Sequence, residues 1–198
     1  MLLLITLVIF SSCPHKHVQQ QEKEVVPVLN NGVRIDTIET PPPIPLVFPP
    51  GTLQINTGST TPEELLAFAK TLTGITYKYA SVDPSVGFDC SGFITYVFNH
   101  FNIVVPRSSI DFTNVEREIS LADAKPGDIV LFTGTDLDST ARKVGHMGII
   151  TSNENGACYF IHSTSGKAYG VTTTLLSKHY AMRFVKVIRI FPQNDTNL

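Results

Sequence analysis

Apolar residues recur at helical spacing in two segments before the middle of this 198-residue chain. The first segment begins at Thr61-Pro62-Glu63-Glu64, which combines a capping box with a proline at the first helical position. Gly74 is placed to end this helix. Between these signals lies the apolar stripe, which consists of Leu65, Leu66, Ala69 and Leu72.

The second helix is predicted to begin at Cys90, with Asp89 as its N-cap residue. It ends before Pro106, and its apolar positions recur at helical spacing. These positions are Phe93, Ile94, Val97, Phe98 and Phe101. Cys90 falls on the same stripe as Ile94 and Val97, so we expect its thiol on the packed side, at the positive end of the helix dipole.

Strand patterns occupy the second half of the chain. Lys125-Pro126-Gly127-Asp128 predicts a turn before a buried strand at residues 129–132. Two more strands are predicted at residues 145–151 and 157–163, joined through Asn155-Gly156, where both residues can take positive φ. A last strand is predicted at residues 183–190. Helices followed by an antiparallel sheet predict an α+β fold.

Residues 1–60 differ in composition from the rest of the chain. Residues 2–10 form an unbroken apolar run, too short for a bilayer span of about 20 residues and typical of a signal-peptide core. Eight of the 13 prolines lie in residues 14–60, which predicts an extended tether. Asn31-Gly32 allows a small hairpin at residues 25–38, but an isolated hairpin is marginal in water, so this stretch is assigned to the tether.

The charge balance excludes some classes of function. The formal net charge is −2, with no basic excess, which argues against a nucleic-acid-binding protein.

Cys90, His146 and His162 are the candidate catalytic residues. A hairpin centred near residue 154 would place His146 opposite His162, where side chains on one face lie about 4.5–5.5 Å apart. One imidazole can then orient the other while the first meets the thiol, as covalent catalysis requires. A helix N-terminus and a nearby protonated histidine lower a thiol pKa to about 3.5–7.5, so we expect a thiolate at neutral pH.

Simpler interpretations exist for each of these residues. Cys90 alone can be a buried structural thiol, and a lone histidine is often a satisfied core residue. A zinc site formed by the three candidates lacks the fourth ligand that structural zinc needs. Cys158 is interpreted as a buried apolar residue, and a Cys90–Cys158 disulfide is disfavoured because one cysteine starts a helix and the other lies within a strand. The other histidines are interpreted as surface residues: His15, His17, His100 and His179.

Residues 61–190 resemble an NlpC/P60 domain, a papain-like family of cell-wall cysteine peptidases. The resemblance rests on six motifs in the order and spacing of the family. They are Gly74-Ile75-Thr76-Tyr77-Lys78-Tyr79, Phe88-Asp89-Cys90-Ser91-Gly92-Phe93, Pro106-Arg107-Ser108, Lys125-Pro126-Gly127-Asp128-Ile129-Val130-Leu131-Phe132, Gly145-His146-Met147-Gly148-Ile149 and Phe160-Ile161-His162-Ser163. The resemblance implies a papain-like fold in which N-terminal helices pack on an antiparallel sheet.

The resemblance also implies roles for individual residues. Cys90 is the implied nucleophile, His146 the general base and His162 the residue that orients it. Tyr77 matches a tyrosine placed near the oxyanion site, beside the backbone N–H of Cys90. The remaining matches, Asp89 and Ser91, are at positions that help to hold the substrate.

The implied activity is that of a peptidoglycan endopeptidase that hydrolyses amide bonds in the stem peptides of bacterial murein, without a metal or organic cofactor. Two alternatives stay open: an acyl or amide transferase of the same superfamily, and a catalytically silent, tethered wall-binding module. Three departures from the family pattern bear on substrate choice. Ala80-Ser81 replaces the usual two glycines, the usual glutamine is absent near Ile110-Asp111-Phe112, and a polar loop occupies residues 135–144.

Phe10-Ser11-Ser12-Cys13 resembles a bacterial lipobox, although no Lys or Arg precedes the apolar run. We therefore predict a signal peptide at residues 1–12, a lipidated N-terminus and Pro-rich tether at 13–60, a catalytic domain at 61–192 and a tail at 193–198. Lipidation of Cys13 predicts an exported lipoprotein, anchored in the outer membrane and facing the periplasm. The alternative is a plain secretory signal with a chance cysteine.

Overall fold

The computed structural model of the protein describes residues 53–115, 117–135 and 142–195. The predictions for the signal peptide, for Cys13 and for the hairpin at residues 25–38 lie outside the described residues. The same is true of most of the polar loop, since residues 136–141 are not described.

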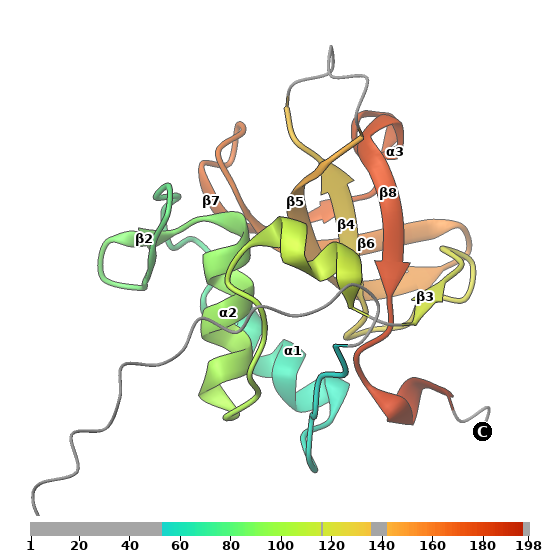
Figure 1. Ribbon diagram of the computed structural model, residues 1–198. Helices are drawn as coiled ribbons and strands as arrows, with labels where there is room; N and C mark the ends of the chain where they lie inside the picture. The colour runs from blue at the N-terminus through green and yellow to red at the C-terminus, as the bar shows by residue number, and fades with distance from the viewer. Residues whose placement is uncertain (1–52, 116, 136–141, 196–198) are drawn as a thin grey trace, which may run out of the picture. The chain divides into compact units, whose positions relative to one another are not determined.

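Two helices and a short hairpin precede the main sheet (Figure 1). Helix α1 has the predicted capping box: Thr61 Oγ1 accepts from the Glu64 N–H at 3.2 Å, and the Glu64 carboxylate accepts from the Thr61 N–H at 2.9 Å. The C-cap of α1 is Leu72, and Gly74 follows with φ +89°. The elements are α1 (Pro62–Thr71), β1 (Val82–Asp83), β2 (Gly87–Phe88), α2 (Cys90–His100) and the 3-10 helix η1 (Ser109–Asn114).

The main sheet has six strands in the order β3-β8-β4-β5-β6-β7, and all neighbours are antiparallel. The strands are β3 (Glu118–Ile119), β4 (Ile129–Thr133), β5 (Val144–Glu154), β6 (Ala157–Thr164), β7 (Gly170–Leu175) and β8 (Phe184–Ile188). A short helix, α3 (Lys178–Arg183), precedes β8, and the 3-10 helix η2 (Pro192–Asp195) follows it. The prediction of an α+β fold with helices packed on an antiparallel sheet is confirmed.

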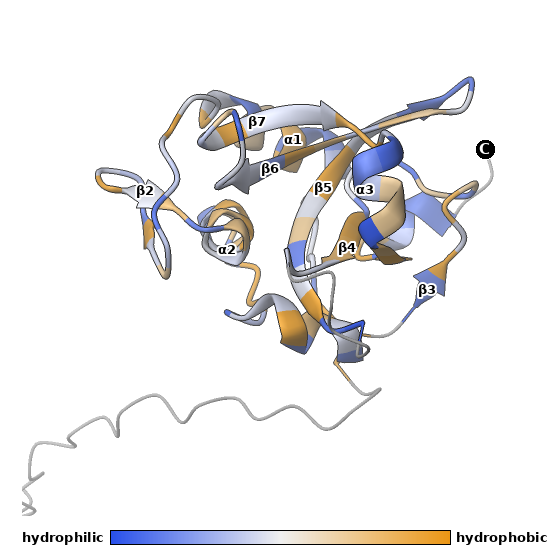
Figure 2. Ribbon diagram, turned by 90° about the horizontal axis from the view of Figure 1, so that it is seen from above, coloured by the Kyte–Doolittle hydropathy of each residue, from blue (hydrophilic) through white to orange (hydrophobic). Residues whose placement is uncertain are grey.

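The sheet buries apolar side chains on both faces. One cluster joins α1 and α2 to the sheet through residues such as Phe93, Ile94 and Met147. The second cluster lies on the opposite face and includes Phe132 and Phe160, with Tyr180 of α3 packed against it. Figure 2 shows α2 and α3 on opposite sides of β5. Each face of the sheet is therefore covered by a helix.

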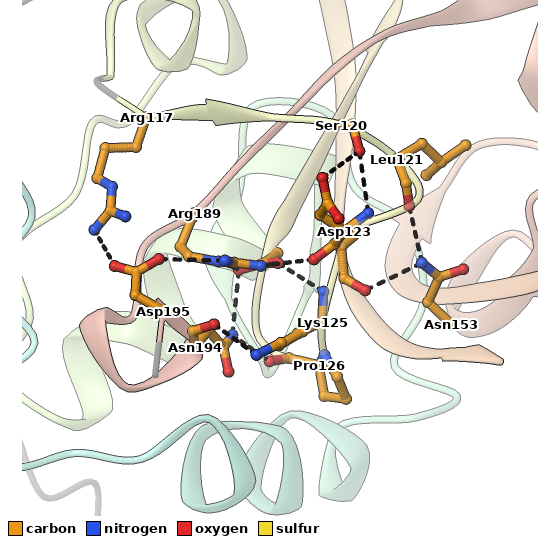
Figure 3. A network of polar contacts seen from close by, with 12 residues as sticks. Arg117, Ser120, Leu121, Asp123, Lys125, Pro126, Asn153, Arg189, Asn194 and Asp195 are labelled. Carbon is orange, nitrogen blue, oxygen red and sulfur yellow. Dashed lines mark hydrogen bonds and ion pairs between the residues drawn. The ribbon is translucent and has the colours of Figure 1, made fainter. Parts of the chain in front are cut away.

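A buried ion pair joins the C-terminal segment to the sheet. Asp128, which is fully buried, accepts from Arg189 at 3.1 Å, and Asn194 donates to the same carboxylate at 3.2 Å. Arg189 also pairs with Asp195, which in turn pairs with Arg117 (Figure 3). We call this set of contacts the C-terminal clasp. The packed domain therefore extends past the predicted boundary at residue 192.

Contacts also extend past the predicted boundary at residue 61. Leu53 forms a β-bridge with Val115, and Thr57 is buried. The segment before α1 thus packs on the domain from residue 53 onward.

Candidate active site

Cys90 stands in the first turn of α2, directly after β2. The N-cap is Asp89, as predicted, and its Oδ1 accepts from the Gly92 N–H at 2.5 Å. Gly92 is needed here because a Cβ at this position would lie 2.0 Å from the Ser81 carbonyl oxygen. The turn before β1 therefore presses against the first turn of α2 and fixes the position of Cys90.

Arg107 pairs with both side chains that flank Cys90. Its guanidinium reaches the two oxygens of Asp89 at 3.2 and 2.7 Å and donates to Ser91 Oγ at 2.9 Å. Asp89 and Ser91 are buried, while the Arg107 side chain is 44% exposed. The role in substrate binding predicted for Asp89 and Ser91 stays a prediction, and the charged group that faces the solvent here is Arg107.

A cleft of about 540 Å³ opens over Cys90. Tyr77 lines it, held by a β-bridge to Phe88 and by a backbone hydrogen bond to the Tyr169 carbonyl at 3.0 Å. Burial raises the pKa of Tyr77, with further contributions from Cys90 and Asp89, so its hydroxyl stays protonated and able to donate. The lining includes Tyr77, Tyr79, Cys90, Arg107, Ser108 and Gly145.

The Cys90 thiol is neutral in this environment, contrary to the sequence prediction. Burial raises its pKa to about 11, and the Asp89 carboxylate adds to the rise. The backbone amides of Ser91 and Cys90 and the charge of Arg107 act in the opposite direction but are outweighed. The prediction considered the helix dipole and a protonated histidine, and it left out the cost of removing a thiolate from water.

The two predicted histidines are hydrogen-bonded to each other. His146 Nε2 lies 2.7 Å from His162 Nδ1, and the ring centroids are 5.0 Å apart. The predicted register of the two strands is wrong by two residues. The prediction placed His146 opposite His162, but Ile149 opposes Ile161, so the next pair along places Gly148 opposite His162. The two imidazoles therefore meet diagonally on one face. The turn at Asn155-Gly156, with positive φ at both residues, is confirmed.

Gly148 gives His162 the space that this diagonal contact needs. A Cβ on Gly148 would lie 2.6 Å from the Phe160 ring and 3.2 Å from the Cβ of His162. A side chain at position 148 would thus compete for the volume that the two residues fill.

Both imidazoles are neutral in the folded domain. Burial lowers the pKa of His146 well below 6.5, and electrostatic interactions with His162 and Arg183 lower it further. Burial and Arg183 lower the pKa of His162 to about 3. A neutral imidazole keeps a lone pair on one nitrogen, which a general base requires.

The thiol lies next to the histidine strand. Cys90 Sγ is 4.0 Å from the carbonyl oxygen of Gly145, the residue before His146. In the described part of the chain, no hydrogen bond joins the thiol to either imidazole. The structure therefore brings His146 and His162 into direct contact and places Cys90 beside the start of β5.

Two groups around the histidines were missed by the sequence analysis. Thr174 of β7 lies 3.0 Å from His162 Nε2, and the buried Arg183 donates to the Thr133 carbonyl at 2.7 Å. Neither residue carried a signal in the sequence. Thr174 lies in a run of three threonines without apolar alternation, and Arg183 ends a helix of only six residues. Arg107 did carry a signal, since it belongs to the Pro106-Arg107-Ser108 motif.

Cys158 is a buried free thiol in the second cluster, and Cys90 is also free. Within residues 53–115, 117–135 and 142–195, no three His, Cys, Asp or Glu side chains gather into a possible metal site. Over the same residues, none of the helices has the length and apolar character needed to cross a bilayer.

Comparison with known proteins gives concordant matches. A profile of the NlpC/P60 family matches residues 74–189. A Bacillus subtilis (strain 168) protein named Gamma-DL-glutamyl hydrolase is 31% identical over 140 residues, covering 69% of this chain and 32% of that protein. A Listeria welshimeri protein named probable endopeptidase p60 is 37% identical over 97 residues, covering 48% of this chain and 18% of that protein.

The solved structures agree on the fold. An NlpC/P60 family protein from Bacillus cereus ATCC 10987 has a TM-score of 0.59 at 21% identity, covering 69% of this chain and 42% of that one. This chain spans about a third or less of the length of the two curated relatives above. The family profile nevertheless covers more than half of the chain and includes Cys90, His146 and His162. The chain belongs to the NlpC/P60 family.

Proposed function

We propose that this protein is a peptidoglycan endopeptidase that hydrolyses amide bonds in murein stem peptides through the Cys90 thiol. The observation that carries the proposal is the buried hydrogen bond of 2.7 Å between His162 and His146, the second of which lies on the strand that starts beside Cys90. The names of the relatives, a glutamyl hydrolase and a probable endopeptidase, support the same class of reaction.

The chemistry follows from the neutral state of the thiol and imidazole. His146 Nε2 is engaged by His162, so Nδ1 is the nitrogen left to take the thiol proton. Sγ then bonds to the substrate carbonyl carbon, and the Cys90 N–H and the Tyr77 hydroxyl donate to the oxyanion. The imidazolium returns its proton to the leaving amine as the C–N bond breaks. Water hydrolyses the resulting thioester and restores the thiol.

The charge of Arg107 supports a substrate with a free carboxylate near the scissile bond. The Arg107 side chain lines the cleft and is 44% exposed, so its guanidinium can donate to a second carboxylate besides that of Asp89. An amide bond made through the side chain of glutamate leaves the α-carboxylate free. A γ-glutamyl bond, of the kind named for the Bacillus subtilis relative, fits this requirement.

We also propose where the protein is located in the cell. A lipidated Cys13 would hold the protein in the outer membrane, and residues 13–60 would let the domain reach wall peptides from the periplasmic face. A single acyl chain binds a membrane only weakly, whereas two or more hold it firmly. A diacylglyceryl group on Cys13 satisfies this condition.

Mass spectrometry of purified muropeptides, incubated with the full chain, tests the reaction. We expect new peptide masses with the wild type and with Cys158→Ser, and none with Cys90→Ala or His146→Ala. His162→Asn should keep part of the activity, because an amide can still bond to the imidazole. Products that carry an added amine or lipid would indicate a transferase, and binding without new masses would indicate a silent wall-binding module.

A fractionation experiment tests the anchor separately. The wild type should partition with membranes, and Cys13→Ser should move to the soluble or precursor pool without loss of activity on soluble muropeptides. An intact mass that shows an N-terminus other than Cys13, or Cys13 without lipid, would contradict the anchor.

A further inference from the structure

The hydrogen bond between the two histidines extends to a third polar group, which lies on the next strand. His162 is fully buried, and its Nε2 lies 3.0 Å from Oγ1 of Thr174 on β7. Phe160 and Tyr180 flank the ring, with centroids at 4.6 and 5.5 Å, so apolar surface covers much of it. Over the described residues, Thr174 Oγ1 is the one hydrogen-bond partner of His162 Nε2.

Thr174 stands at the edge of a second cavity, of about 550 Å³. Lys167 and Tyr180 also line this cavity, which shares no lining residue with the cleft over Cys90. Because Thr174 is only partly buried, water in this cavity can accept the proton of its hydroxyl. The threonine can then use its oxygen as an acceptor toward His162.

The proposed reaction fixes the direction of each hydrogen bond in this chain. When His146 takes the thiol proton, both of its nitrogens carry hydrogen, and Nε2–H must be donated to His162 Nδ1. His162 Nδ1 must then be unprotonated, so a neutral His162 carries its proton on Nε2. That N–H is buried and needs an acceptor, because an unpaired buried donor is costly.

We propose that Thr174 is a positioning residue, whose hydroxyl accepts the Nε2–H of His162 and so holds both imidazoles in the tautomers that let His146 act as base. This inference rests on the proposed function. The Thr174 hydroxyl also stabilises the positive charge that forms on His146. When His162 donates its Nε2–H to Thr174, its Nδ1 becomes a better acceptor for the Nε2–H of His146.

Three variants of the full chain test the role by steady-state cleavage of muropeptides. Thr174→Val keeps the shape and removes the acceptor, so kcat should fall about 10–100-fold while KM changes by less than about twofold. Thr174→Ser restores a hydroxyl and should return kcat to within about threefold of the wild type. The control is Thr173→Val, at an exposed neighbouring position on β7, which should leave kcat unchanged.

The ¹⁵N shifts of the His162 imidazole give a second measurement that does not depend on activity. We expect the wild type to carry the proton on Nε2, and Thr174→Val to lose this preference while its melting temperature stays close to that of the wild type. A wild-type proton on Nδ1, or a Thr174→Val enzyme with full kcat, would overturn the inference. If Thr174→Val does not fold, the inference is still tested by the tautomer of His162 in the wild type and by the kcat of Thr174→Ser. A wild type that cleaves no muropeptide would refute the proposed function alone, because the tautomer can still be measured.

Discussion

Asp89 acts on its neighbour Cys90 in two opposing ways. Its carboxylate caps α2 and pairs with Arg107, and both the amides at this end of the helix and the Arg107 charge lower the pKa of Cys90. The same negative charge adds to the effect of burial and raises the pKa of Cys90. At rest the site therefore holds a thiol beside neutral imidazoles, and in the proposed reaction proton transfer would accompany the attack on the substrate.

Alkylation kinetics report on this neutral thiol. Because only the thiolate reacts and the thiol pKa is raised to about 11, the rate at Cys90 should rise about tenfold per pH unit between about pH 7 and 9. Iodoacetamide labelling followed by peptide mass spectrometry measures the rate. Cys158, which is only 5% exposed, should react more slowly than Cys90 at every pH and serves as the internal control. A rate at Cys90 that is constant between about pH 6 and 8 would instead indicate a preformed thiolate.

At the scale of single elements, β5 and β6 set the contact between the histidines. The strands pair with an irregularity between Ile150 and Ser152, so their register differs from that of a simple hairpin. Gly148 then lies where His162 and Phe160 need room.

Gly148→Ala should disturb this part of the sheet. The added methyl would lie 2.6 Å from the Phe160 ring and 3.0 Å from the Ile161 carbonyl, so the strands must shift. We expect a loss of about 1–3 kcal/mol in the free energy of unfolding, measured with denaturant, and a lower rate of cleavage. Gly134→Ala is the matched control, because a Cβ there meets nothing within 4 Å. Equal stability and activity in the two variants would show that Gly148 is not a packing constraint.

The sequence was informative wherever a local signal sets the structure. Asp89 and Thr61 cap the two helices as predicted, because a cap depends on residues three positions apart. The register of His146 and His162 depends on the β-bulge between Ile150 and Ser152, which no residue type in the sequence predicts. The pairings of Asp89 with Arg107 and of His162 with Thr174 join separate segments, so they depend on the fold as a whole. The raised thiol pKa likewise follows from burial, which becomes known only with the packing.

At the scale of the whole domain, the C-terminal clasp ties η2 to the turn before β4. Asp128→Asn would leave Arg189, which is 9% exposed, without its buried counter-charge. We expect a loss of about 3–5 kcal/mol in the free energy of unfolding, measured by urea denaturation. Glu118→Gln removes the partner of a more exposed pair with Lys186 and should cost less than about 1 kcal/mol. Similar losses in both variants would contradict a special role for the clasp.

The two buried histidines should also make the stability of the domain depend on pH. The unfolded chain takes up protons at these positions below about pH 6.5, whereas the folded domain resists because both pKa values are lowered. Stability should thus be full above about pH 6.5 and fall as the pH drops, by up to about 2.7 kcal/mol per pH unit if both groups contribute. Thermal melts between about pH 7 and 5 measure the slope. His162→Asn should flatten it and His179→Asn, at an exposed position, should not.

The place of β8 in the sheet has a consequence for how the newly made chain matures. β8 comes last among the strands in sequence, yet it lies between β3 and β4. While the polypeptide is still emerging, β3 and β4 have no partner between them, and α2 with its thiol is already synthesised. Such pairing between distant segments is slow to form. The proposed hydrolytic activity should therefore appear only once β8 has been made and has paired with β3 and β4, so a molecule that lacks β8 should not cut murein peptides.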